Sequence, residues 1–79
     1  MARVLLFGRL RDIAGWSERA LPADTLGALT AALAAEAPEL GEALRAKGVR
    51  AAVNLEMVRG EVLLRPDDEV AFMPPMSGG

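Results

Sequence analysis

The sequence contains no histidine, no cysteine and no tyrosine. The chain therefore has no imidazole base, no thiolate nucleophile, and no thiolate or imidazole ligand for zinc or haem. The absence of cysteine also excludes a disulfide framework. These absences exclude most mechanisms by which one small subunit catalyses a reaction. We expect a protein that is not catalytic alone and that binds no cofactor or metal directly.

Strong charge and long apolar segments are also missing. The formal net charge is -2 and charged residues make up 25% of the chain, so neither charge-driven disorder nor a basic nucleic-acid surface is indicated. No basic leader precedes the apolar run over residues 4–8, which is far shorter than a signal sequence or a membrane span. We therefore expect a cytoplasmic protein that binds neither nucleic acid nor membranes.

The apolar residues that are present follow the periods of short strands. Strand patterns occupy residues 3–7, 16–21, 49–56 and 69–73. The first is a continuous apolar run, which predicts a central strand covered on both faces, whereas the second suits an edge strand. In the third, Val49, Ala51, Val53 and Leu55 alternate with more polar residues. A small hairpin-like stretch follows over residues 57–64, and residues 66–68 carry a turn signal.

One helix is predicted between the second and third strand patterns. Thr25 and its neighbour Asp24 are good N-cap residues, and Leu29 and Leu33 fall on one helical face. Pro38 disfavours helical geometry at the residue before it and so ends this helix. Residues 38–47 can hold another short helical turn.

The order of these elements is strand, strand, helix, strand, short elements, strand. A helix laid across a mixed sheet, with the first and last strands as neighbours, buries both strands and the leucine face. We therefore predict an α+β fold of the β-grasp type. Residues 1–79 are expected to form a single domain, with residues 1–75 globular and residues 76–79 a flexible, projecting tail.

The end of the chain carries the chemistry. Pro74 and Pro75 lack backbone donors and end regular pairing before the last residues, Met76, Ser77, Gly78 and Gly79. Two glycines without Cβ atoms make a thread thin enough for a narrow cleft in another protein. The reactive group that this thread delivers is the α-carboxylate of Gly79. Adenylation would give that carboxylate a good leaving group, and a sulfide could then convert it to a thiocarboxylate.

On these residues the chain resembles ubiquitin-like proteins and, more narrowly, the MoaD family, the small sulfur-carrier subunits of molybdopterin synthase. The resemblance runs through residues 4–11 with Gly15, through residues 51–54, and through residues 68–79. The last segment is the specific one: an acidic pair, a short apolar strand, Pro-Pro, two variable residues and Gly-Gly. Met73 departs from the family, where an aromatic residue is frequent at this place.

The resemblance implies a cycle in which this chain donates sulfur. An activating enzyme of the ubiquitin-activating (E1-like) type adenylates Gly79, consuming ATP, and a sulfurtransferase system supplies the sulfur for a thiocarboxylate. The tail then enters the large catalytic subunit of molybdopterin synthase and gives sulfur to a cyclic pyranopterin precursor. Two donations build the molybdopterin dithiolene. The family also implies a heterotetramer built around a dimer of the large subunit.

Several other residues are candidates for partner binding. Phe7, Met57 and Met73 are expected to form an apolar docking patch on the exposed face of the sheet, since methionine adapts to successive partners. The alternative is that all three belong to the core. Arg9 and Arg11 are placed in the loop after the first strand, and Arg11 is the stronger candidate because the family has a basic residue there. Pro74, Pro75, Met76 and Ser77 complete the predicted partner-binding segment.

Asn54 and the acidic residues near the end are interpreted as structural. Asn54 ends a strand before a turn, where its side chain can cap the backbone. Asp67, Asp68 and Glu69 suit a turn better than a metal site, since adjacent carboxylates on an extended strand point to alternate sides.

Other functions remain open at this point. Sulfur carriers for thiamin, for transfer-RNA thiolation or for cysteine synthesis would use the same tail. A protein modifier that forms isopeptide bonds, or a β-grasp interaction module with an inert tail, belongs to a different functional class. The modifier could form chains on itself only through Lys47 or the N-terminus, because Lys47 is the sole lysine.

Overall fold

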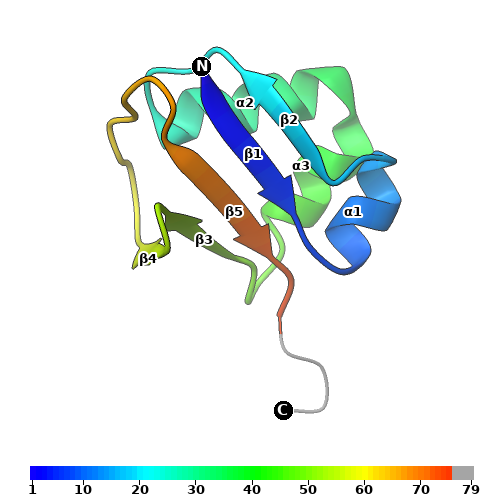
Figure 1. The fold of residues 1–79 in the computed structure, drawn as a ribbon. Helices are drawn as coiled ribbons and strands as arrows, with labels where there is room; N and C mark the ends of the chain where they lie inside the picture. The colour runs from blue at the N-terminus through cyan, green and yellow to red at the C-terminus, as the bar shows by residue number, and fades with distance from the viewer. Residues whose placement is uncertain (76–79) are drawn as a thin grey trace.

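A five-stranded mixed sheet forms the centre of the fold in the computed structural model, which describes residues 1–75 (Figure 1). Its strands are β1 (Ala2–Leu6), β2 (Glu18–Leu21), β3 (Arg50–Val53), β4 (Glu56–Val58) and β5 (Glu69–Met73). The order across the sheet is β2-β1-β5-β3-β4, with β1 and β5 parallel and the other pairs antiparallel. The predicted β-grasp is thereby confirmed, including the first and last strands as neighbours.

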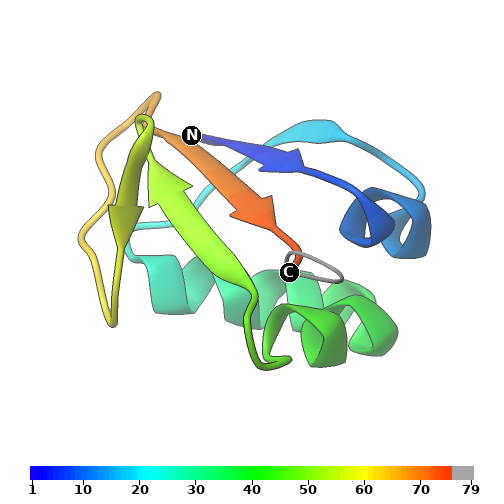
Figure 2. The same ribbon diagram turned by 90° about the horizontal axis from the view of Figure 1, so that it is seen from below.

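Three helices accompany the sheet within residues 1–75. They are α1 (Arg9–Ala14), α2 (Leu26–Glu36) and α3 (Pro38–Leu44). Figure 2 shows α2 and α3 as a second layer beneath the sheet, so the opposite face of the sheet is left open. Within this part of the chain, no helix combines the length and the apolar character needed to cross a membrane.

The main helix begins and ends where the sequence predicts. The Thr25 hydroxyl accepts a hydrogen bond of 3.0 Å from the backbone N–H of Ala28, which satisfies one of the free donors of the first turn. The helix ends at Glu36, because Ala37 is held in an extended conformation before Pro38. Pro38 then starts α3, where its missing N–H costs no hydrogen bond.

The core lies between the sheet and the helical layer. Val4 and Val70 are register partners on the parallel strands β1 and β5, and both side chains are fully buried. Leu29 and Leu33 cover them from α2, as the leucine face predicts. Along β5, Val70 and Phe72 point into this core, which confirms the predicted alternation.

Three details of the sequence prediction are wrong. The first strand is covered on one face only, because the helices lie on one side of the sheet, and Arg3 is exposed. Arg9 and Arg11 lie in α1 and not in a loop, because Leu10 from this helix fills the end of the core. Leu55, placed in the third strand pattern, lies instead in the β3–β4 turn and is 88% exposed.

The hairpin is also placed differently. β3 and β4 are joined directly by Asn54 and Leu55, both with positive φ, and Gly60 follows β4 at the start of an irregular segment. The second strand is an edge strand as predicted, but it begins at Glu18. Trp16 lies just before it, half-buried, with the Arg19 guanidinium 5.0 Å from the centre of its ring.

Replacing Gly41 with alanine is expected to destabilise the fold, although alanine normally favours a helix. Gly41 is buried on α3, and an added Cβ would collide with the Cβ of Ala34 on α2 and lie 2.8 Å from its Cα. Overpacking of this kind costs about 1–3 kcal/mol, which exceeds the helical gain of about 1 kcal/mol. Urea unfolding would measure the loss. Glu42→Ala, on an exposed position of the same helix, is the control and should change stability little.

Candidate functional site

The segment that leads to the tail starts from a fixed strand. β5 is hydrogen-bonded to β1 on one side and to β3 on the other. At its end, the carbonyl of Phe72 accepts a bond of 3.2 Å from the N–H of Phe7, and Met73 lies opposite Arg50. The chain therefore reaches Pro74 in a defined position. The remaining predicted tail residues, Met76, Ser77, Gly78 and Gly79, lie outside the described residues.

Two glycines hold the Pro-Pro pair that precedes the tail. Gly8 follows β1 with a φ of 57°, and an added Cβ there would lie 2.8 Å from the Cγ of Pro74. Gly48 precedes β3 with a φ of 90°, and its added Cβ would lie 2.7 Å from the Cβ of Pro75. Both positions combine a left-handed backbone with a close approach, which only glycine satisfies without strain. The sequence analysis missed these two residues, and their positions at strand ends were the available signal.

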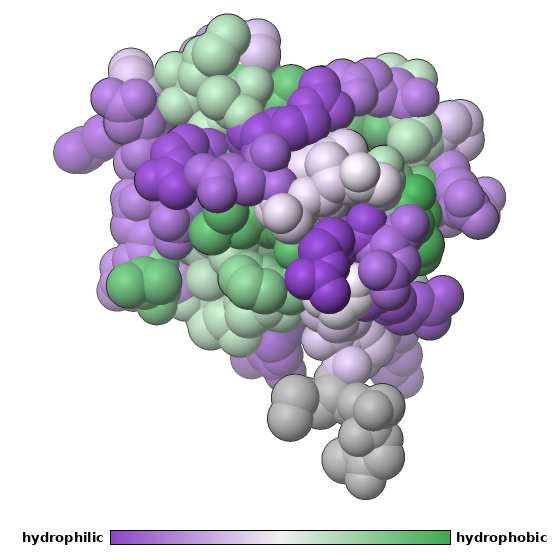
Figure 3. Space-filling model, turned by 45° about the vertical axis from the view of Figure 1, so that its right-hand side comes forward, coloured by the Kyte–Doolittle hydropathy of each residue, from purple (hydrophilic) through white to green (hydrophobic). Residues whose placement is uncertain are grey.

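The open face of the sheet carries an apolar row. Register partners Leu5, Ala71, Ala52 and Met57 lie side by side across β1, β5, β3 and β4. In Figure 3, hydrophobic residues gather in the middle of the visible surface, between hydrophilic ones. Ala52 and Ala71 are only 7% and 8% exposed, so the apolar surface that this row presents to solvent comes from its ends, Leu5 and Met57. Leu5 and Ala52 were not predicted as part of this surface, although alternation along their strands indicates it.

Of the predicted docking residues, Met57 belongs to this row, and Phe7 and Met73 lie beside it on the same face. Phe7 is 47% exposed, Met57 is 57% exposed and Met73 is half-buried. Phe7 and Met73 follow the register partners Leu6 and Phe72, so they are neighbours at one end of the face. Met57 lies on β4, two strands from Met73. The structure thus brings Phe7 and Met73 together and leaves Met57 farther along the same face; a docking role for them stays a prediction.

Arg11 lies next to Phe7. The exposed Arg11 side chain and Phe7 line a hollow of about 360 Å³, with Glu18 of β2 on its wall. Glu18 also pairs with Arg3 at 2.6 Å, and its carboxylate raises the pKa of the Arg3 guanidinium through the hydrogen bond. Arg9 lies instead beside Pro74 and Pro75, around a smaller hollow of about 70 Å³.

The acidic turn before β5 is structural, as predicted. The Asn54 side chain accepts a bond of 3.0 Å from the Glu69 N–H and donates one of 3.0 Å to Asp68. The Asp68 carboxylate accepts hydrogen bonds from the Arg65 backbone N–H and from the Asn54 side chain. These bonds, the one from Arg65 first, hold the pKa of Asp68 below its ordinary value. Within residues 1–75, no group of three or more acidic residues is placed to hold a metal ion.

Comparisons with known proteins agree on one family. The sequence profile of the ThiS family matches residues 4–79. The chain is 37% identical, over 81 aligned residues and 100% of both chains, to the molybdopterin synthase sulfur carrier subunit of Escherichia coli strain K12.

Solved structures with other names share this fold. The solution structure of small archaeal modifier protein 1 from Methanosarcina acetivorans superposes with a TM-score of 0.88 at 26% identity, over 99% of this chain and 95% of that one. CysO from Mycobacterium tuberculosis gives a TM-score of 0.83 at 25% identity, over 96% of this chain and 100% of that one.

The variant Gly48→Ala tests the contact that holds Pro75. It is expected to lose stability for two reasons, a left-handed backbone and the collision with Pro75. Gly15→Ala is the matched control, since Gly15 has a φ of 84° but no atom within 4 Å of an added Cβ. In both variants the left-handed backbone should lower the free energy of unfolding by about 1–2 kcal/mol. In Gly48→Ala, overpacking against Pro75 should lower it by about 1 kcal/mol more. Equal losses in urea unfolding would show that Pro75 is not held by this contact.

Proposed function

The chain belongs to the ThiS family of sulfur carriers, and from this membership we propose that it is the sulfur-carrier subunit of a molybdopterin synthase. Its identity of 37% over the whole length to a sulfur carrier subunit of that synthase is the observation that carries the proposal. The end of the chain supports the proposal, because its acidic pair, short apolar strand, Pro-Pro and Gly-Gly follow the pattern of the MoaD family.

The proposed chemistry takes place at the α-carboxylate of Gly79. The carboxylate attacks the α-phosphate of ATP on an E1-like activating enzyme, which releases pyrophosphate and leaves an acyl adenylate. A hydrosulfide equivalent from a sulfurtransferase system then displaces AMP and leaves a thiocarboxylate. In the synthase, this sulfur attacks a cyclic pyranopterin precursor, and hydrolysis returns the carboxylate. Two such donations form the molybdopterin dithiolene.

This chain supplies the sulfur and its position, while the partner supplies acid and base groups. The absence of histidine and cysteine fits this division, because no side chain of the chain offers an imidazole or a thiolate. The large catalytic subunit is proposed to bind the open face through Phe7, Arg11, Met57 and Met73. Pro74 and Pro75, with the tail residues Met76 and Ser77, then lead Gly78 and Gly79 into its active site, in a heterotetramer.

A protein modifier is the second candidate function. The likeness to small archaeal modifier protein 1, with a TM-score of 0.88, is the observation that favours it. Intact mass, after incubation with ATP, an activating enzyme and a sulfur source, distinguishes the two. A mass gain that matches sulfur in place of oxygen supports the carrier, whereas a ladder of conjugates supports the modifier. Conversion of the pterin precursor by added large subunit then separates molybdopterin synthesis from the other sulfur pathways.

Deletion of Gly79 is expected to abolish thiocarboxylate formation while the fold keeps its stability. The described core is built from residues up to β5, so we expect the stability of the fold not to depend on Gly79. Intact mass measures the thiocarboxylate and thermal unfolding measures stability. A variant that still acquired sulfur would overturn the assignment of the reactive carboxylate. Glu42→Ala, at an exposed position of α3 that leaves the whole tail in place, is the control.

The double variant Met57→Asp and Met73→Asp is expected to weaken binding to the large subunit by at least about a hundredfold. Burying each methionine contributes on the order of 1.5–3 kcal/mol, and about 2.7 kcal/mol corresponds to a hundredfold. Calorimetric titration measures the affinity, and circular dichroism checks that the variant folds alone. The control is Met1→Asp, since Met1 is 63% exposed and lies outside the open-face row. Unchanged affinity would place the docking surface elsewhere.

A further inference from the structure

The chain carries two amines that an activated C-terminus can acylate, and the fold places them at opposite ends of the sheet. One is the α-amine of Met1, and the other is on the side chain of Lys47, the sole lysine. β1 and β5 run parallel, and the Asp67 N–H donates a bond of 2.8 Å to the Met1 carbonyl. Met1 therefore lies beside the start of β5, whereas the tail follows the end of that strand.

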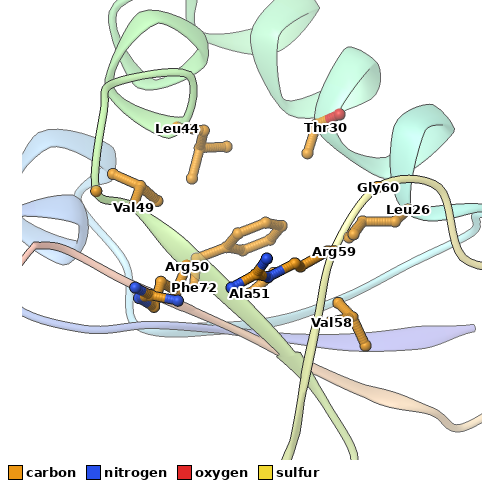
Figure 4. A pocket seen from close by; sticks show the side chains of 11 residues that line it. Leu26, Thr30, Leu44, Val49, Arg50, Ala51, Val58, Arg59, Gly60 and Phe72 are labelled. Atoms are coloured by element: carbon orange, nitrogen blue, oxygen red, sulfur yellow. The ribbon is translucent and has the colours of Figure 1, made fainter.

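Lys47 lies in a tight turn that joins α3 to β3. The Val49 N–H donates a bond of 3.2 Å to the Ala46 carbonyl across this turn. Gly48 takes the third position of the turn with a φ of 90°, as a type II turn requires. Figure 4 shows Val49 and Leu44 of α3 facing the same hollow, and Val49 is half-buried. The inner side of the turn is thereby anchored, while Lys47 is exposed to solvent.

This turn contacts the segment that leads to the tail. An added Cβ on Gly48 would lie 2.7 Å from the Cβ of Pro75. Ala46 lines a small hollow together with Pro74 and Pro75. Figure 1 shows the loop before β3 beside the end of β5. Consecutive Cα atoms are about 3.8 Å apart, so the Lys47 Cα lies within about 8 Å of Pro75.

The length of the tail decides which of the two amines its end can reach. Four residues follow Pro75, and a fully extended chain of this length spans at most about 14 Å. The five residues of β5 alone cover about 16 Å, so the tail is too short to return to Met1. The four-carbon stem of Lys47 carries its amine about 6 Å from the backbone. The tail can therefore reach Lys47 without being fully extended.

We propose that Lys47 is an internal acceptor of the activated C-terminus, so that Lys47 and Gly79 of one chain form an isopeptide ring. The neutral ε-amine attacks the carbonyl carbon of the Gly79 acyl adenylate. A C–N bond forms, and the bond from the carbonyl carbon to the phosphate oxygen of AMP breaks. AMP leaves with the electron pair, and the amine loses its proton to water. The product is a monomer that is lighter than the free acid by one water.

The ring gives the activating enzyme a second task, which is to enclose the tail until sulfur arrives. An acyl adenylate that leaves the enzyme earlier is closed by Lys47, and the chain is then lost as a carrier. In the second candidate function, the ring competes with chains built on Lys47 of another copy. Ring formation rests on the proposed function in one respect, the activation of Gly79, and does not depend on which acceptor later receives the sulfur.

A C-terminal thioester of the full chain tests the ring without any enzyme. The chain is prepared as a thioester of mercaptoethanesulfonate at Gly79, and its decay is followed by intact mass. Attack by Lys47 releases the thiol and leaves the ring, whereas hydrolysis leaves the free acid, which is heavier by one water. A short flexible linker gives an effective concentration of about 1 mM, so at about 10 µM protein rings should exceed linked dimers about a hundredfold. Tryptic peptides should include a branched one that joins Lys47 to Gly79.

Moving the lysine to the other end of the sheet gives the matched control. Lys47→Arg with Arg65→Lys keeps the composition and the net charge. Arg65 is exposed before the start of β5, where its carbonyl accepts a bond of 3.1 Å from the Asp68 N–H. This variant should form rings at least about tenfold more slowly and should mainly hydrolyse. Circular dichroism checks that it folds.

Three results would overturn the proposal. They are an equal rate of ring formation in the variant with the moved lysine, linked dimers as the main product of the unaltered chain, and hydrolysis alone. The proposed function fails in a different way. If deletion of Gly79 still allows sulfur loading, the carrier assignment of the carboxylate is lost, whatever the thioester does. If sulfur loading requires Gly79 but the thioester gives no ring, the carrier function stands and Lys47 is no acceptor.

Discussion

The parallel pairing of β1 with β5 is the constraint on which the rest of the structure depends. Val4 and Val70 meet in this pair with no exposure to solvent, although 66 positions separate them in the sequence. Because β3 then pairs with the other edge of β5, the last strand is held on both sides. Gly8 after β1 and Gly48 before β3 consequently reach the same end of the sheet, where they hold Pro74 and Pro75. The direction of the tail segment is thus set by the centre of the core.

Local signals were sufficient for the elements that carry this pairing. The Thr25 cap and the Pro38 stop bound α2, and alternation along residues 69–73 predicted which β5 side chains are buried. The sequence predictions failed where contacts between distant segments of the chain determine the local structure. α1 has six residues, fewer than two helical turns, so no repeat of apolar positions marks it in the sequence. Leu10 of this helix fills the end of the core. Alternation also extended past Val53 to Leu55, because the turn there lacks glycine and proline.

The same difference between local and long-range signals applies to the candidate site. Strand alternation predicted that Met73 lies on the face opposite Phe72, since the side-chain period of a strand is a local property. Met57 was placed on the exposed face only as an adaptable apolar residue. A hollow of about 450 Å³ beside Phe72, between the sheet and the helices, has no such signal (Figure 4). It depends on the Glu61 carboxylate reaching the Gly27 N–H, which is 34 positions away in the sequence. A sequence pattern cannot indicate how far two layers separate at one edge.

Recognition surfaces, and not catalytic side chains, are therefore where this small chain can differ from other carriers. Arg50 belongs to the open-face surface, because it lies opposite Met73 at the border of that face. A partner that covers Met73 lies within reach of Arg50, and one that also covers Met57 buries a single continuous strip of the open face. Two enzymes that take the same tail in turn can then differ in how much of this strip they cover. Their affinities can be set independently while the reacting carboxylate stays unchanged.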